Sequence, residues 1–274
     1  MMENRKRKIY GAAMMAAVLM IGATGCKSNT NVQEKDNNLE NQTGKQIENQ
    51  TGTSDTSGNV VTVGSKENET FADLLEKTND IEELYTYIEN NAEGATKEEW
   101  DEWIRGITNF GEGDAEYDRF QEYRGNMSEE MKSFVELMSA EQARPSFNEE
   151  GNQLTLGEIL ERCIAIEQHM TAYGKGDTYS ILYPKYCQLI NAAITGGYDG
   201  LNIETNEYLE KDKKHIRTNV IEEYERTIKD NPDSETADIL EDYVKVLKEN
   251  DNIVNKNVEK FYGNIYEEVD EKIS

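Results

Sequence analysis

The stretch 155-TLGEILERCIAIEQHMTAY-173 decides the fold class of this chain. Its apolar side chains recur every three or four residues, which is the spacing of one face of an α-helix. Thr155, followed three residues later by Glu158, matches the capping box that starts many helices. The stretch therefore predicts a long amphipathic helix. Its inner face comprises Leu156, Ile159, Leu160, Cys163, Ile166, Met170 and Tyr173.

The same period continues on both sides of this stretch, from about residue 68 to the end of the chain. Gly196-Gly197 and Asn231-Pro232 are typical of helix ends. Asp251 falls on the inner face of the last apolar stripe, which favours a kink near Asn250. Further helices are predicted over about 71–88 with a restart at Asp80, 96–111, 128–143, 179–194, 202–228 and 240–269, with a short element at about 114–124.

This pattern predicts an all-α domain over residues 68–274, built as an irregular antiparallel helical bundle. The residues before it differ in composition. Residues 27–67 almost lack large apolar side chains, and the word ENQTG occurs twice, at 40–44 and 48–52. Such a segment cannot bury enough surface to offset the loss of chain entropy. We therefore interpret residues 26–67 as a disordered linker, which would span on the order of 35 Å as a random coil.

The first 25 residues have the pattern of a secretory signal. The basic cluster Arg5–Lys8 precedes the uncharged and largely apolar run Ile9–Ala23. A helix that spans a membrane needs about 20 apolar residues. The run is shorter than that and therefore predicts a signal peptide over residues 1–25 instead of a membrane-spanning helix.

The end of the run, Ala23-Thr24-Gly25-Cys26, resembles the lipobox of bacterial lipoproteins, with Ala23 where leucine is usual. The resemblance covers residues 1–26 only. It implies that the Cys26 thiol carries diacylglycerol, that the signal is cleaved just before Cys26, and that the new amino terminus is acylated, as with palmitate. Each buried methylene contributes about 0.8 kcal/mol, so two or three chains hold a protein firmly. The alternative is an ordinary signal peptide with an incidental cysteine.

The resemblance places the predicted domain on the extracytoplasmic face of a bacterial cell membrane, anchored by lipid. The charge agrees with attachment by lipid and not by electrostatic attraction. The chain has 29 Lys and Arg against 55 Asp and Glu, a net charge of −26. A surface of this sign repels nucleic acid and anionic lipid, so neither is expected as a charge-driven partner.

Cys163 and Cys187 remain once Cys26 is assigned to the lipid, and an exported chain permits a disulfide. If two helices turn near residue 175, Cys163 lies opposite about residue 188, within bridging range of Cys187. If the second helix instead begins at Pro184, where proline fits the first turn, the two cysteines are several turns apart. The sequence leaves a disulfide and two buried free thiols as alternatives.

Catalytic and metal-binding motifs are not found in the sequence, so no cofactor and no metal is predicted. The two histidines, His169 and His215, match no metal-ligand spacing. There is no Gly-x-Ser-x-Gly elbow and no glycine-rich phosphate loop. Asp and Glu are so abundant that a single pair of them indicates nothing.

Aromatic residues at helical spacing are the best ligand candidates in the sequence. Tyr and Trp present a flat apolar body with a polar tip, which suits stacking on sugars or peptides. The alternative is that these rings belong to the core of the bundle. The candidates are Trp100, Trp103, Tyr179, Tyr183 and Tyr186.

The sequence as a whole predicts a lipid-anchored, non-enzymatic module of the cell envelope that binds a protein, a peptide or a glycan. An envelope hydrolase that uses carboxylates is the first alternative, because its residues would meet only in the folded chain. A solute-binding lipoprotein of a transporter is the second, although such proteins usually contain repeated strands, and the sequence predicts none.

Overall fold

The structure is a computed structural model that describes residues 69–110, 115–148, 151–197 and 206–273. The chain divides into two units, Met1–Thr62 and Val63–Ser274, and every described residue belongs to the second. The predicted signal peptide, Cys26 and the predicted linker 26–67 lie outside the described residues.

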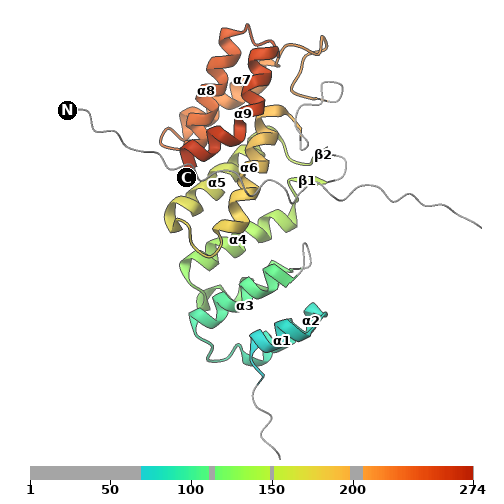
Figure 1. Ribbon diagram of the computed structural model, residues 1–274, viewed down its shortest axis with the longest axis vertical. Helices are drawn as coiled ribbons and strands as arrows, with labels where there is room; N and C mark the ends of the chain where they lie inside the picture. Colours follow the sequence, from blue (N-terminus) through green and yellow to red (C-terminus); the bar gives the residue numbers. More distant parts are fainter. Residues whose placement is uncertain (1–68, 111–114, 149–150, 198–205, 274) are drawn as a thin grey trace, which may run out of the picture. The chain divides into compact units, whose positions relative to one another are not determined.

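The described residues are mostly helical, which confirms the prediction of an all-α domain. Two short antiparallel strands, β1 (Phe147–Asn148) and β2 (Gly151–Asn152), form a hairpin that the sequence analysis did not predict. In chain order (Figure 1) the helices are α1 (Phe71–Lys77), α2 (Ile81–Asn91), α3 (Lys97–Phe110), the 3-10 helix η1 (Tyr117–Asn126), α4 (Glu129–Ala143), α5 (Leu156–Tyr173), α6 (Tyr179–Thr195), α7 (Thr218–Asp230), α8 (Glu235–Glu249) and α9 (Lys256–Ile273).

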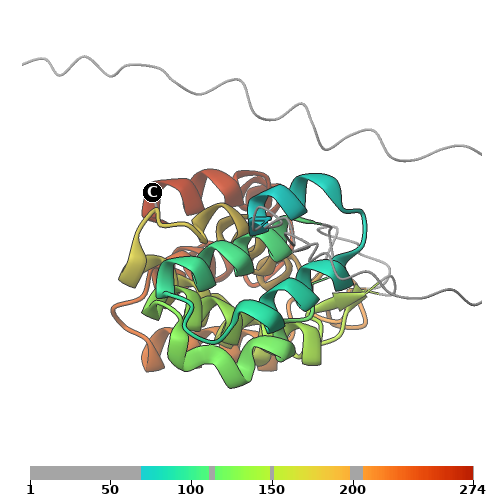
Figure 2. The ribbon, with the colours of Figure 1, turned by 90° about the horizontal axis from the view of Figure 1, so that it is seen from below.

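Helix α5 is the central element of the packing. It lies along α6 and also contacts α4, α7 and α8. Helix α9 packs on both α8 and α6. Helices α1, α2 and α3 contact one another and are seen together in Figure 2, in blue to green. Buried apolar side chains form one continuous core, which extends from Phe71 to Val269.

The helix starts agree well with the predicted caps. At the start of α5, the backbone N–H of Glu158 donates to Thr155 Oγ1, while the Thr155 N–H donates to the Glu158 carboxylate at 2.9 Å. Thr96 and Glu99 make the same reciprocal pair before α3. Asp80 caps α2 at the predicted place, but the reciprocal bond from Glu83 that a capping box requires is replaced by a bond from Thr78 Oγ1 to the Glu83 carboxylate. These local signals are short-range, so the sequence alone indicates them.

The helix predicted over about 202–228 is shorter in the described residues, and its predicted start at Asn202 lies outside them. Residues 206–217 are not helical, and α7 begins at Thr218. In the described residues before it, Leu209 and Ile216 form an antiparallel bridge. The carboxylate of Asp212 accepts hydrogen bonds from two of the backbone amides that follow it. An aspartate bonded to nearby amides favours a turn over a helix, and here that preference overrides the apolar period.

The kink predicted near Asn250 is a complete break between α8 and α9. Asp251 and Asn252 have φ angles of 55° and 57°, in the left-handed region that an α-helix excludes. The N–H of Asn252 donates to the carbonyl of Leu247 at 2.8 Å and so completes the end of α8. The apolar period continues across this break because both helices cover the same core.

A buried carboxylate of α5 holds the N-terminus of α8. Glu167 is only 6% exposed. Its carboxylate accepts hydrogen bonds from Ser234 Oγ at 2.9 Å, from the N–H groups of Glu235 and Thr236 at 2.8 Å each, and from Thr236 Oγ1. Since the Thr236 hydroxyl gives its proton to Glu167, it accepts a hydrogen bond from Tyr186 OH at 2.9 Å. Helices α5, α6 and α8 are thereby joined in the core.

Replacing Glu167 with glutamine tests this connection. The change removes the charge and turns an acceptor into a donor that faces the α8 amides. We expect Glu167→Gln to lower the free energy of unfolding by roughly 2–3 kcal/mol, because buried donors are left without an acceptor. Urea denaturation followed by circular dichroism measures the change. The exposed neighbour Gln168 is the control, since Gln168→Ala should cost less than about 0.5 kcal/mol. An unchanged stability of Glu167→Gln would contradict the capping role.

Candidate binding cleft

A cleft of about 280 Å³ lies where α4, α5 and α6 meet. Its floor is apolar and includes Leu137, Leu154 and Ile166. Its walls carry side chains of both charge signs, contributed by all three helices. They are Glu141, Arg144, Glu158, Glu161, Arg162 and Lys185.

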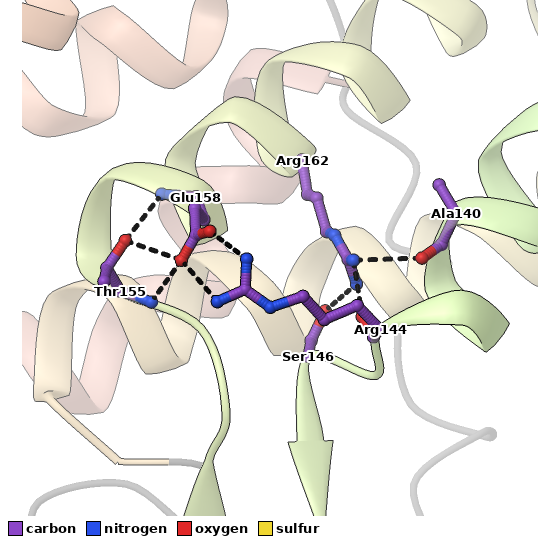
Figure 3. A network of polar contacts seen from close by, with 6 residues as sticks. All are labelled: Ala140, Arg144, Ser146, Thr155, Glu158 and Arg162. Carbon is purple, nitrogen blue, oxygen red and sulfur yellow. Dashed lines mark hydrogen bonds and ion pairs between the residues drawn. The ribbon is translucent and has the colours of Figure 1, made fainter.

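Arg162 on α5 closes the C-terminal end of α4 (Figure 3). Its Nη2 donates to the carbonyls of Ala140 at 3.1 Å and Arg144 at 2.5 Å. Its Nη1 donates to Ser146 Oγ at 2.7 Å and to the carboxylate of Glu141. The last carbonyls of a helix lack some of their intrahelical donors. The Ala140 carbonyl accepts the Arg144 N–H, and the Arg162 guanidinium adds a second donor there and supplies one to the Arg144 carbonyl. Because four of its five N–H groups are used in this way, Arg162 shapes the cleft and has little left for a ligand.

Arg144 and Glu158, which both line the cleft, form a bidentate ion pair (Figure 3). One prong joins Arg144 Nη2 to Glu158 Oε2 at 3.1 Å, and the other joins Nη1 to Oε1. Glu158 also accepts the hydrogen bonds of Thr155 at the start of α5. The backbone N–H of Thr155, then its hydroxyl and then Arg144 lower the pKa of Glu158 to about 2. Glu158 is therefore ionised near neutral pH and is not a proton donor there.

Among the charged side chains that line the cleft, Lys185 and Glu161 make the fewest hydrogen bonds and ion pairs within the described residues. Lys185 Nζ lies 3.4 Å from Glu141 Oε1, which leaves further N–H groups of its ammonium unused. Within the described residues, Glu161 has no hydrogen-bond or ion-pair partner, and its side chain is exposed. The cleft can therefore offer one cation and one anion to a ligand, above an apolar floor.

Three of the five predicted aromatic ligand contacts lie in the core. Trp100, Trp103 and Tyr186 are 0%, 4% and 0% exposed. The rings of Trp100 and Trp103 pack edge to face at 5.2 Å, and the hydroxyl of Tyr186 is bonded to Thr236. A ligand would reach these rings only after the core had repacked.

The other two candidates, Tyr179 and Tyr183, are half-buried at the start of α6. Their rings stack with a centroid distance of 5.3 Å and an interplanar angle of 13°. Tyr183 OH donates to the carboxylate of Asp270 on α9. Tyr179 borders a different cavity, of about 220 Å³, together with Lys175 and Lys272. The structure thus separates these two tyrosines from the cleft at α4, α5 and α6.

Cys163 and Cys187 are free thiols, and both are buried. The structure therefore has the second of the two alternatives that the sequence left open. Helix α6 begins at Tyr179, so Pro184 lies inside the helix and does not start it. Burial raises the pKa of Cys187 to about 11 and that of Cys163 well above its usual range. Both groups remain protonated near neutral pH and are poor nucleophiles.

His169 belongs to a buried polar chain that connects α4 to the turn before α6. Its Nδ1 lies 2.9 Å from Ser133 Oγ, and its Nε2 lies 2.7 Å from Thr178 Oγ1. Thr178 Oγ1 donates to the Glu130 carboxylate at 2.9 Å, so His169 Nε2 carries a proton and Nδ1 accepts one from Ser133. Burial lowers the pKa of His169, which keeps the ring neutral. The network orders the turn before α6.

No family model, curated protein sequence or solved structure matches this chain. In the part of the chain that the structure describes, no group of three or more His, Cys, Asp or Glu side chains could hold a metal ion. Among the helices in these same residues, none combines the length and the apolar character that crossing a membrane requires.

The roles of the two arginines can be separated by the same substitution. Arg162→Lys should lower the free energy of unfolding by roughly 1–2 kcal/mol, because three donors on a flexible stem cannot serve four fixed acceptors. Arg144→Lys changes an exposed ion pair and should cost less than about 1 kcal/mol. Urea denaturation of both variants in parallel gives the comparison. Equal losses would show that Arg162 does not hold the end of α4.

Proposed function

We propose that this protein is a lipid-anchored, non-enzymatic binding module of the bacterial cell envelope. Its cleft at α4, α5 and α6 takes a short peptide segment that carries both charge signs. The observation that carries this proposal is the cleft, where Lys185 and Glu161 stand above an apolar floor with bonding capacity unused.

The size and the chemistry of the cleft support a small peptide ligand. A volume of about 280 Å³ is near the lower end of small-molecule sites, which suits two or three amino-acid residues. A ligand carboxylate would meet Lys185, a ligand ammonium or guanidinium would meet Glu161, and an apolar side chain would cover Ile166. The fixed network of Arg162 and Glu158 keeps the walls in place before the ligand arrives, which reduces the entropy lost on binding.

Binding is better supported than hydrolysis. The described residues that line the cleft include no serine, cysteine or histidine. The cleft carboxylate of Glu158 is bonded to Thr155 and Arg144, and its pKa is lowered. A general acid near neutral pH needs a raised pKa, so Glu158 does not suit that role. The envelope hydrolase and the transporter-linked solute-binding protein have no comparable observation in their favour.

The anchor rests on the resemblance at residues 1–26 and on the linker composition. Cys26 would be the lipid attachment site, and residues 27–67 would separate the helical domain from the bilayer. The strongly acidic composition supports attachment by acyl chains, since a surface of this charge is repelled by anionic lipid.

Cell fractionation tests the anchor. The full chain should sediment with membranes and carry a diacylglyceryl group at Cys26 by mass spectrometry, whereas Cys26→Ala should lose both the modification and the membrane association. Cys187→Ala is the control, because it removes a thiol without touching the lipobox, and it should stay with the membrane. A membrane-bound Cys26→Ala protein, or a native product with an unmodified Cys26, would contradict the anchor.

Calorimetric titration with uncapped tripeptides that contain one leucine tests the cleft. Lys185→Met and Glu161→Gln should each weaken binding about tenfold, since each removes one charged contact, worth about 1.4 kcal/mol on this scale. The matched controls are Lys260→Met and Glu249→Gln, which make the same changes on α9 and α8 and should leave the affinity within about twofold. Binding that is absent, or that the control variants weaken as strongly, would refute the peptide site.

A further inference from the structure

A second hollow follows the other side of α5, where α5 faces α7 and the turn between α7 and α8. One cavity, of about 300 Å³, extends along α5 from Gly157 to Ile164. Another, of about 440 Å³, continues from Ile164 to Ala172. The two cavities share Ile164, Asp230 and Asn231, so they form one groove. We call it the α5–α7 groove.

The length and the floor of the α5–α7 groove suit an extended chain. From Gly157 to Ala172 the helix rises about 22 Å, and an extended peptide of six or seven residues covers that distance. The floor includes Ile164, which is 8% exposed. At one end the Glu223 carboxylate of α7 lies against Gly157, where a Cβ would be 2.6 Å from Glu223 Oε1. At the other end the hollow is bordered by the turn around Pro232.

The rim of the groove carries negative charge that the protein does not neutralise. Asp230 and Asp233 are exposed, and within the described residues neither has a hydrogen-bond or ion-pair partner. Arg226 is the one basic side chain among the described residues that line the groove, and it is paired with Glu223. The Glu167 carboxylate at the floor already accepts hydrogen bonds from the amides at the N-terminus of α8. An occupant of the groove would therefore meet three free carboxylates beside Ile164, those of Asp230, Asp233 and Glu161, and Glu161 also lines the cleft at α4, α5 and α6.

We propose that the α5–α7 groove docks an extended basic segment of a partner protein, about six residues long, with lysine or arginine at alternate positions. Alternate side chains of an extended chain point the same way, so the basic ones meet Asp230 and Asp233. The small side chains between them contact Ile164 and Pro232. The exposed Gln168 amide offers a hydrogen bond to the peptide backbone. Glu161 lines both hollows, but the proposal does not depend on a peptide binding in the cleft at α4, α5 and α6.

Fluorescence anisotropy with a capped hexapeptide, in which lysine alternates with alanine, tests the groove in the full chain. The double variant Asp230→Asn/Asp233→Asn should weaken binding at least tenfold. Gln168→Glu adds a carboxylate to the groove and should strengthen binding about threefold, a gain that misfolding cannot produce. Lys185→Met in the separate cleft should leave this affinity within twofold, which distinguishes the two proposals.

The charge control is essential because the whole chain is acidic. Glu102→Gln/Asp118→Asn removes the same charge from exposed positions on α3 and η1, and it should leave the affinity within twofold. Equal weakening by this control would overturn the proposal, because it would assign binding to the general field of the protein. A linear tetramine that binds as tightly as the peptide would also overturn it, because charge alone would then be recognised.

Discussion

The carboxylate of Glu167 is the group on which the arrangement of the helices most depends. A carboxylate taken out of water is unfavourable unless its oxygens are hydrogen-bonded. Here three consecutive residues at the start of α8 supply the donors, Ser234 through its hydroxyl and Glu235 and Thr236 through backbone amides that a helix leaves without partners. The buried carboxylate needs donors and the first amides of α8 need an acceptor, so this contact fixes the position of α8 relative to α5. Tyr186 extends this bond to α6.

Arg162 has the complementary role at the other side of α5. It places a cation at the C-terminal carbonyls of α4, whereas Glu167 places an anion at the N-terminal amides of α8. Both charges have the sign that the helix dipole favours at that end. The cleft borders the first contact, and the α5–α7 groove borders the second. One helix therefore positions both proposed binding surfaces through charged side chains on its two sides.

Most of the helical pattern could be predicted, because apolar period and capping are local properties of the sequence. The stretch 155–173 and its Thr155–Glu158 box are examples. The helix prediction failed at Asp212, where a local turn interrupts an apolar period that continues. At Asp251 the sequence predicts a kink, and the structure has a complete break. The hairpin at Phe147 is too short to show a strand period.

The binding surfaces were largely beyond sequence reasoning. Glu158 and Arg162 are four residues apart and so share a helix face, which is a signal the sequence contains. Their partners Arg144 and Ala140 become visible only once the hairpin returns the chain to α5. The partners of Glu167 lie 67 to 69 residues away. Trp100 and Tyr186 recur at helical spacing, as ligand contacts on one helix face would. Core residues recur at the same spacing, so the sequence cannot separate the two roles, and the structure buries both rings.

Amide hydrogen exchange at Glu235 and Thr236 tests the central role of Glu167 most directly. First-turn amides normally lack intrahelical partners and exchange readily. Here the account predicts that these two exchange only when the whole domain unfolds. The amides of Glu129 and Glu130 are the comparison, because they occupy the same positions of α4 after a serine N-cap. They should exchange far faster. Equally fast exchange at both helix starts would contradict the account.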